Sequence, residues 1–255
     1  EATTENIVGL LNKDLIDVNY IFNMNYAEII EKLQQLANPE KVIFKQKKFG
    51  IIAHNSLGIY HQDLKQIAQE IGKNNDLAIE LYNSGIYEGR LLCSKIFNPK
   101  LITETLMEQW VKDFENWEVC DSFSMGVFAK SKMAVSKAKE WTSREREFEK
   151  RAGFTIMAAY CMADKKADNK VFESFIPYII KESKDDRVYV KKAVNWALRS
   201  IGKRNTDLNK IAIETAYEIQ KSDIKSAQWI AKDAISDLNA EKVNILDYPR
   251  SIYRV

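Results

Sequence analysis

Trp117 and Asp121 are the residues whose types and spacing most directly suggest chemistry. They lie four positions apart in the sequence NWEVCDSF, residues 116–123. Residues four apart are neighbours on the surface of a helix, so the pair places an aromatic ring and a carboxylate on one face. Carboxylates are among the side chains that carry acid–base chemistry, and we treat this pair as a candidate site.

Arg151 is a candidate partner for the carboxylate of Asp121. It lies in a segment that is otherwise apolar, beside Ala152 and Phe154, and an arginine in such a segment requires an anionic partner. The alternative is a structural salt bridge that ties adjacent repeats of the chain together. The sequence alone leaves both interpretations open.

A third group of residues mixes cations with an aromatic ring. Spacings of four, three and four place four side chains on one helix face: Lys192, Trp196, Arg199 and Lys203. Such a face suits a groove that receives phosphates, with the ring packed against a sugar or a base. The alternative is that Trp196 points into the core between Val194 and Leu198.

Charge is balanced over the whole chain, with 38 basic and 36 acidic residues, but it is uneven locally. Seven basic residues and one acidic residue, Asp207, lie between Arg187 and Lys210. This excess indicates a phosphate-facing surface, although solvated helix faces have the same appearance. Our candidate contacts are Lys47, Lys48, Lys191, Lys192, Arg199, Lys203 and Arg204.

Helices must position these side chains. Nine glycines and four prolines are too few for the turns of a β-rich fold, and apolar residues recur at spacings of three and four. Polar breaks separate helical segments, for example at Asn38-Pro39, at residues 72–75 and at residues 163–169. These patterns predict an all-α protein.

The later helices repeat. A charged residue precedes a small one and an apolar stripe at Ala152, Ala193 and Ala234, which are spaced 193 − 152 = 41 and 234 − 193 = 41 residues apart. This period is typical of HEAT and armadillo repeats. We expect a right-handed superhelical solenoid with a basic concave face, forming a single domain over residues 1–255.

Several function classes receive no support from the sequence. The three cysteines and two histidines are too few and too widely spaced to suggest a disulfide framework or a metal site. We expect buried, reduced thiols, and neither a metal nor a cofactor. No apolar run is long enough to span a membrane, and the first residues lack the pattern of a signal peptide. We therefore expect a cytoplasmic protein with no obligate protein partner.

Three segments resemble the AlkD-like DNA alkylation repair proteins, which are HEAT-like repeat DNA glycosylases. These segments are NWEVCD (116–121), EKRAGF (149–154) and, most specifically, VKKAVNWALRSIGKRN (190–205). The similarity begins near residue 47 and extends to the C-terminal repeat. One departure is Phe49, where some family members have a tyrosine, so a phosphate or sugar contact would be lost.

The resemblance implies an enzyme that excises positively charged N3- and N7-alkylated purines from double-stranded DNA. Trp117, Asp121 and Arg151 match the family's catalytic tryptophan, aspartate and arginine, and Trp196 matches a second tryptophan that faces the lesion. In this interpretation Asp121 stabilises the cationic sugar of the transition state and positions water.

A noncatalytic helical-repeat scaffold that binds DNA or another protein is the main alternative. It predicts the same fold and the same basic face. The two functions differ at Asp121, because a carboxylate that faces DNA would weaken binding by repelling phosphate.

Overall fold

The computed structural model describes residues 24–240, and every regular element in this range is a helix. The all-α prediction is confirmed. The described residues fall into two compact units that meet between Asn98 and Pro99, so the first unit has residues 24–98 and the second has residues 99–240. A single domain over the whole chain stays a prediction.

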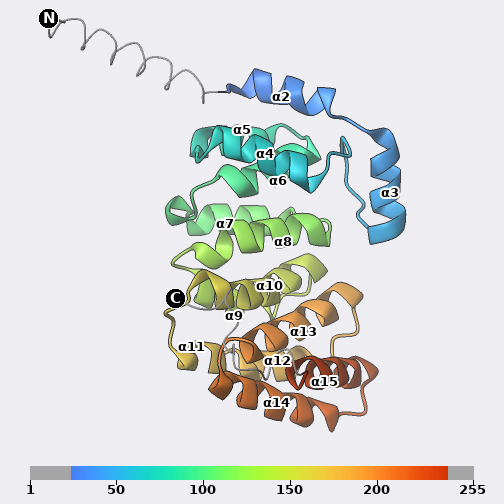
Figure 1. Ribbon diagram of the computed structural model, residues 1–255, viewed down its shortest axis with the longest axis vertical. Coiled ribbons are helices and arrows are strands. Elements are labelled where there is room, and N and C mark those ends of the chain that lie inside the picture. Colours follow the sequence, from blue (N-terminus) through green and yellow to red (C-terminus); the bar gives the residue numbers. More distant parts are fainter. Residues whose placement is uncertain (1–23, 241–255) are drawn as a thin grey trace, which may run out of the picture. The chain divides into compact units, whose positions relative to one another are not determined.

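The described part of the first unit contains helices whose ends follow the predicted breaks (Figure 1). Asn25, Asn38 and Asn74 each cap a helix by accepting a hydrogen bond from a backbone N–H group in the first turn. Helix α6 packs against both α4 and α5. The helices are α2 (Tyr26–Gln35), α3 (Pro39–Phe49), α4 (His61–Ile71), α5 (Asn75–Asn83) and α6 (Tyr87–Ile96).

The loop before α4 is held by one buried carboxylate. Glu88 is fully buried, and its oxygens accept hydrogen bonds from the Ser56 hydroxyl and from the backbone N–H groups of Leu57, Gly58 and Ile59, at 2.8–3.3 Å. Gly58 adopts a φ of +74°, where an added Cβ would lie 2.2 Å from the Asn38 carbonyl oxygen. The loop conformation therefore depends on this glycine and this glutamate.

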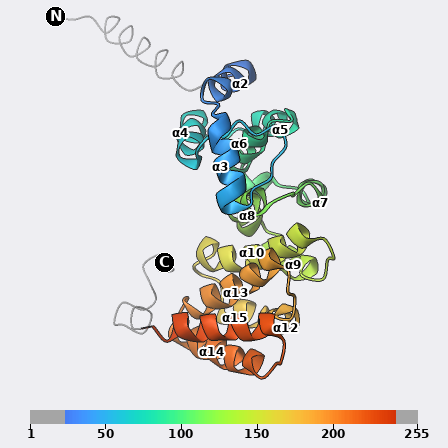
Figure 2. The ribbon, with the colours of Figure 1, turned by 90° about the vertical axis from the view of Figure 1, so that its right-hand side faces the viewer.

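The second unit is built around α10, which packs against α8, α9 and α13. Helix α13 in turn packs against α12, α14 and α15, and Figures 1 and 2 show α8, α10, α13 and α15 following one another through the unit. The elements are η1 (Pro99–Leu101), α7 (Glu104–Lys112), α8 (Trp117–Gly126), η2 (Phe128–Lys130), α9 (Ala134–Trp141), α10 (Glu147–Ala163), α11 (Asn169–Glu173), α12 (Ile176–Glu182), α13 (Val188–Gly202), α14 (Thr206–Gln220) and α15 (Lys225–Leu238).

The 41-residue period corresponds to this stacking. Ala152, Ala193 and Ala234 lie on α10, α13 and α15, and all three are fully buried. Small side chains at equivalent positions allow the helices to approach one another closely, which is how repeat proteins build a continuous core.

Gly153 marks a close approach between α10 and α9. A Cβ at this position would lie 2.8 Å from the Ala138 carbonyl oxygen and 3.0 Å from the Thr142 nitrogen. We expect Gly153→Ala to lower the free energy of unfolding by about 1–3 kcal/mol, because the helices must separate to admit the methyl group. Urea denaturation followed by circular dichroism measures the change. An unchanged or higher stability would contradict this close packing.

The three cysteines are buried free thiols, as predicted, and burial raises the pKa of each. Within residues 24–240, no group of histidine, cysteine, aspartate and glutamate side chains is arranged to hold a metal ion. No helix in this range combines the length and the apolar character needed to cross a membrane.

Candidate active site

Asp121 and Trp117 lie on the first part of α8. The helix starts at Trp117 because Asn116 caps it, accepting hydrogen bonds from the N–H groups of Glu118 and Val119 at 2.9 and 3.2 Å. Val119, Cys120 and Phe123 are buried on the core side. Asp121 and Trp117 are only half-buried, so the less covered side of α8 presents both.

The carboxylate of Asp121 is held by α10. Arg151 donates from Nε to Oδ1 at 2.9 Å and from Nη2 to Oδ2 at 2.7 Å, so that two parallel hydrogen bonds fix the carboxylate. Thr155, one turn along α10, donates its hydroxyl to Oδ1 at 3.2 Å. The predicted contact between Arg151 and Asp121 is therefore present.

Arg151 is anchored on its other side by α13. Its Nη1 donates to the Tyr189 carbonyl oxygen at 2.6 Å. Burial by itself would lower the pKa of this guanidinium, but the carboxylate of Asp121 raises it above its usual value. A permanently charged, rigid arginine thus links three successive helices and orients Asp121.

Asp121 keeps capacity for a further interaction. The side chain is 16% exposed, against 8% for Arg151. An ionised carboxylate has about four acceptor positions, and the three hydrogen bonds from Arg151 and Thr155 leave room for about one more. The Asp121 carboxylate can therefore bind a water molecule or face a cationic group while Arg151 and Thr155 keep its orientation fixed.

Trp196 does not belong to the core. It is half-buried on α13, whereas Ala193, Val194, Ala197 and Leu198 around it are fully buried. This partial exposure favours the interpretation in which the ring lies at the surface over the one in which it points into the core. Trp196 lies on the helix that packs directly against α10, the helix that carries Arg151.

Two of the predicted phosphate contacts on α13 are already in ion pairs. Arg199 binds Asp233 at 2.8 Å and Asp237 at 2.7 Å, and Lys203 also binds Asp237. Burial raises the pKa of Asp237, but the hydrogen bonds from Lys203 and Arg199 outweigh it and lower the pKa overall. Helix α15 thus neutralises the cations at this end of α13.

Arg204 occupies a different environment from the one predicted. It is only 5% exposed, and its guanidinium donates to the carbonyl oxygens of Cys161 at 2.6 Å and Ala167 at 3.1 Å. Its cation also lies 4.3 Å from the ring centre of Phe172. Arg204 therefore ties the end of α13 to the end of α10, and its buried guanidinium is not placed to contact phosphate.

The remaining predicted contacts are nearer to solvent. Lys192 is exposed, and Lys191 is half-buried with its ammonium 5.0 Å from the ring centre of Trp229 on α15. Lys47 and Lys48 are exposed near the end of α3, in the first unit.

The Asp121–Arg151 pair differs in exposure from a second ion pair between helices. Arg199 and Asp233 form this second pair, which joins the neighbouring helices α13 and α15. The Arg199–Asp233 side chains are 32% and 41% exposed, far more than the 8% and 16% of Arg151 and Asp121. Desolvation offsets much of the attraction in a buried ion pair, so burial adds little net stability. Burial alone does not separate a structural role from a catalytic one, because Lys150–Glu182 and Lys203–Asp237 are also ion pairs in which each side chain is only 12% exposed.

Sequence reasoning missed three polar partners. Thr155 lies one helical turn after Arg151, a spacing that could have revealed it. Asp233 and Asp237 lie one period after Lys192 and Trp196, because 192 + 41 = 233 and 196 + 41 = 237. The repeat could therefore have placed acidic side chains beside the cations of α13.

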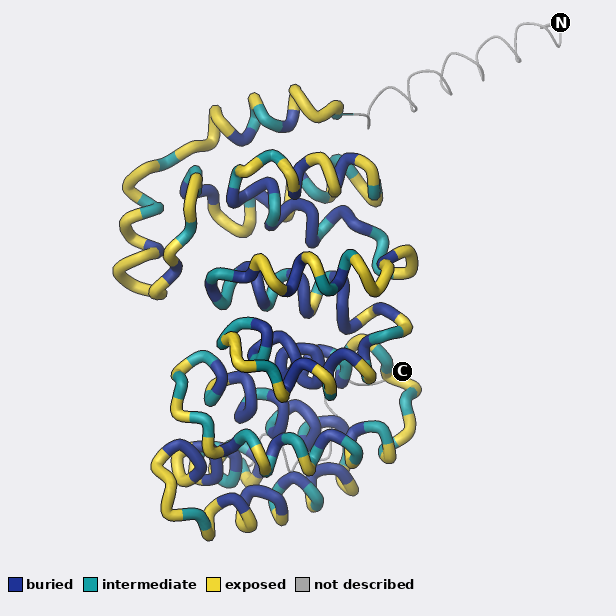
Figure 3. The backbone as a smooth tube through the Cα atoms, turned by 180° about the vertical axis from the view of Figure 1, so that it is seen from behind, coloured by how far each residue is buried: buried dark blue, intermediate teal, exposed yellow. Residues whose placement is uncertain are grey.

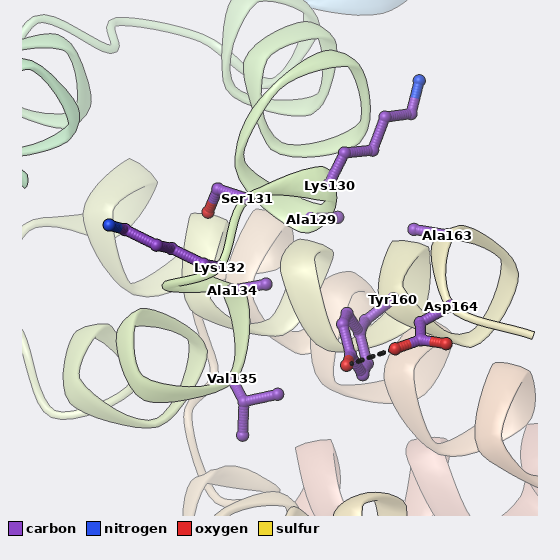
Figure 4. A pocket seen from close by; sticks show the side chains of 9 residues that line it. All are labelled: Ala129, Lys130, Ser131, Lys132, Ala134, Val135, Tyr160, Ala163 and Asp164. Carbon is purple, nitrogen blue, oxygen red and sulfur yellow. Dashed lines mark hydrogen bonds between the residues drawn. The ribbon is translucent and has the colours of Figure 1, made fainter. Parts of the chain in front are cut away.

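A pocket of roughly 290 Å³ lies elsewhere in the second unit, around the C-terminal end of α10 (Figure 4). Tyr160 donates its hydroxyl to Asp164 at 2.9 Å within it, while the amines of Lys130 and Lys132 extend away from these two residues. None of the predicted site residues lines this pocket. The candidate site is instead a surface on α8, α10 and α13.

Comparisons with known proteins point to one family. A sequence model of the family described as DNA alkylation repair enzyme matches residues 29–238. The uncharacterized protein Lin0241 of Listeria innocua is 26% identical over 222 residues, covering 84% of this chain and 95% of that protein. Lmo0209 of Listeria monocytogenes is 25% identical over 222 residues, with the same coverage.

A solved structure has a similar fold. It is described as representing a new family of proteins related to the HEAT-like repeat DNA glycosylases with affinity for branched DNA structures. It is 23% identical, with a TM-score of 0.66, and the match covers 82% of this chain and 94% of that chain. The predicted HEAT-like helical-repeat fold is thereby confirmed.

Proposed function

Since this chain belongs to the DNA alkylation repair enzyme family, we propose that it hydrolyses the N-glycosidic bond of N3- or N7-alkylated purines in duplex DNA. An alkylated purine carries a positive charge and is already a good leaving group. The barrier then lies in the oxocarbenium character that develops on the deoxyribose, as in other glycoside hydrolyses.

The observation that carries this proposal is the state of Asp121. Its carboxylate is held in one orientation by Arg151 and Thr155, yet it is partly exposed and has room for a further donor. A fixed negative charge beside the sugar stabilises the developing cation without the cost of reorganisation. The free acceptor position can orient the attacking water.

The other residues have supporting roles in this proposal. Arg151 is a positioning residue, because its donors hold Asp121 and the Tyr189 carbonyl. Trp117 and Trp196 present half-buried rings that can pack beside the cationic lesion, where a π-face favours positive charge. Lys191 and Lys192 on α13, with Lys47 and Lys48 on α3, supply phosphate contacts. A basic concave face remains part of this proposal.

The reaction is tested by incubating the protein with duplex DNA that carries 7-methylguanine or 3-methyladenine and measuring free base by chromatography. We expect time-dependent release from the alkylated duplex and none from an unmodified duplex of the same sequence. Binding to the alkylated duplex without release of base would contradict the glycosylase assignment.

DNA binding without catalysis is the second candidate, and it is favoured by the description of the solved relative, which has affinity for branched DNA. In this case a four-way junction should bind more tightly than a linear duplex of equal length, and no base should be released. Fluorescence anisotropy with the two DNAs separates the candidates, because excision of a base from duplex DNA does not require tighter binding to a junction.

Lys192 and Lys203 should differ in their contributions to DNA binding, although the sequence predicts a phosphate contact for both. Lys192 is exposed, whereas Lys203 is 12% exposed and paired with Asp237. We expect Lys192→Ala to flatten the slope of log affinity against log salt by about one unit, and Lys203→Ala to change it by clearly less. Anisotropy titrations at several salt concentrations measure both slopes. Equal slopes for the two variants would contradict the ion-pair argument.

A further inference from the structure

Helix α3 of the first unit carries an exposed surface of aromatic rings and lysines. Phe44 and Phe49 are 45% and 44% exposed, although large aromatic side chains are usually covered. In Figure 3, which views the molecule from behind, α3 is the largely yellow helix at the upper left. The helix has four lysines, of which Lys45 is buried, and one glutamate, Glu40, so its surface carries a net positive charge.

The cations lie directly beside the rings. The Lys48 ammonium lies 5.1 Å from the ring centre of Phe44 and 5.5 Å from that of Phe49. The two rings meet edge to face, with centres 5.8 Å apart and planes at 85°. A flat ring and a positive charge are therefore presented side by side.

The other end of α3 repeats this combination. The Lys41 ammonium lies 3.5 Å from the ring centre of Tyr60, which is 47% exposed. Seven residues separate Lys41 from Lys48, which corresponds to about 10 Å along a helix. A strand of a few nucleotides can reach both pairs.

We propose that this surface, formed by Lys41, Phe44, Lys48, Phe49 and Tyr60, binds unpaired nucleic acid. A nucleotide presents a flat base next to an anionic phosphate, which complements a ring next to an ammonium. Bases in an intact duplex are stacked on one another and cannot use the rings. The surface therefore selects single-stranded or frayed segments, and it does not depend on the excision chemistry of Asp121.

The arrangement fits a nucleic acid better than a lipid surface. An interfacial membrane helix separates an apolar face from a charged one. Here Lys48 lies over the exposed rings themselves, so the charge and the apolar surface occupy the same place. Desolvating that ammonium in lipid would be costly, whereas a phosphate would pair with it.

The test uses fluorescence anisotropy with a labelled single-stranded oligonucleotide and a blunt duplex of the same length. We expect the protein to bind the single strand, and Phe44→Ala and Phe49→Ala each to weaken this binding roughly tenfold or more, because a base loses its stacking partner. Phe44→Trp should retain the affinity. Duplex binding by the two phenylalanine variants should change little, because Lys48, a proposed phosphate contact for the duplex, is retained in both. Lys48→Gln should flatten the salt dependence of single-strand binding by about one unit.

Ile43→Ala and Ile52→Ala are the matched controls. Both side chains are exposed and apolar, at 53% and 62%, but have no ring on which a base can stack. We expect their single-strand affinities to equal that of the wild type. An equal loss in the isoleucine and phenylalanine variants, or no loss in either, would overturn the proposal. So would sedimentation with anionic phospholipid vesicles in the absence of single-strand binding.

Discussion

Asp121→Asn is expected to reduce base excision by about a hundredfold or more while duplex binding is retained. Asparagine has nearly the same shape, but it has no negative charge to stabilise the cationic sugar and one carbonyl oxygen in place of two carboxylate oxygens. Single-turnover release of base from an alkylated duplex measures the rate, and anisotropy with the same duplex measures binding.

Asp233→Asn is the matched control for this substitution. Asp233 also accepts a hydrogen bond from an arginine across two packed helices, but it lies on α15 and is not part of the proposed site. We expect near wild-type excision from this variant. Excision that survives in Asp121→Asn, or that falls equally in both variants, would exclude the proposed role of Asp121.

The control also separates chemistry from folding. Arg151 is 8% exposed, and replacing its anionic partner leaves a buried cation with weaker compensation. A thermal unfolding curve of each variant shows whether the protein remains folded at the assay temperature. Loss of excision in a folded, DNA-binding Asp121→Asn protein can then be attributed to the chemical step.

Glu88→Ala is expected to lower the free energy of unfolding by about 3 kcal/mol or more. Glu88 is fully buried, and its carboxylate is the acceptor for three consecutive backbone N–H groups and for the Ser56 hydroxyl. The substitution leaves buried donors without an acceptor and also opens a cavity. Each of these effects is independently destabilising.

Urea denaturation followed by circular dichroism measures this loss, with Glu80→Ala as the control. Glu80 lies on α5 in the same unit but is exposed. Removal of an exposed side chain is expected to change the free energy of unfolding by about 0.5 kcal/mol or less. Similar stabilities for the two variants would show that Glu88 does not hold the loop.

Local sequence signals predicted the ends of the helices well. Asn38 and Asn205 cap α3 and α14, and Pro39 occupies the first position of α3, where a missing N–H group has no cost. Gly72 ends α4. These positions were readable because capping depends on residues within one or two turns of the helix end.

The repeat predicted packing as well as secondary structure. Alanines at a spacing of 41 residues identified the equivalent buried positions of α10, α13 and α15. The contact between Arg151 and Asp121 was expected on the same grounds, because an arginine in an apolar stripe requires an anion from a neighbouring helix. The spacing of residues in the sequence could not show whether this contact is structural or catalytic.

The positions of the other cations depended on tertiary structure. Arg204 follows a basic, polar-looking segment, yet its side chain turns inward to cap carbonyl oxygens at the end of another helix. Glu88 likewise has a partner loop about 30 residues earlier in the chain. No local sequence pattern shows whether a charged side chain faces solvent or a distant backbone group. A count of basic residues therefore overestimates the number of cations that are available to phosphate.

Release of free 7-methylguanine or 3-methyladenine from duplex DNA, measured for the wild type beside Asp121→Asn, tests the central claim most directly. Our account predicts release by the wild type and little or none by the variant, with both proteins bound to the duplex. Bound duplex with no release by either protein would contradict it and would favour a DNA-binding function without excision.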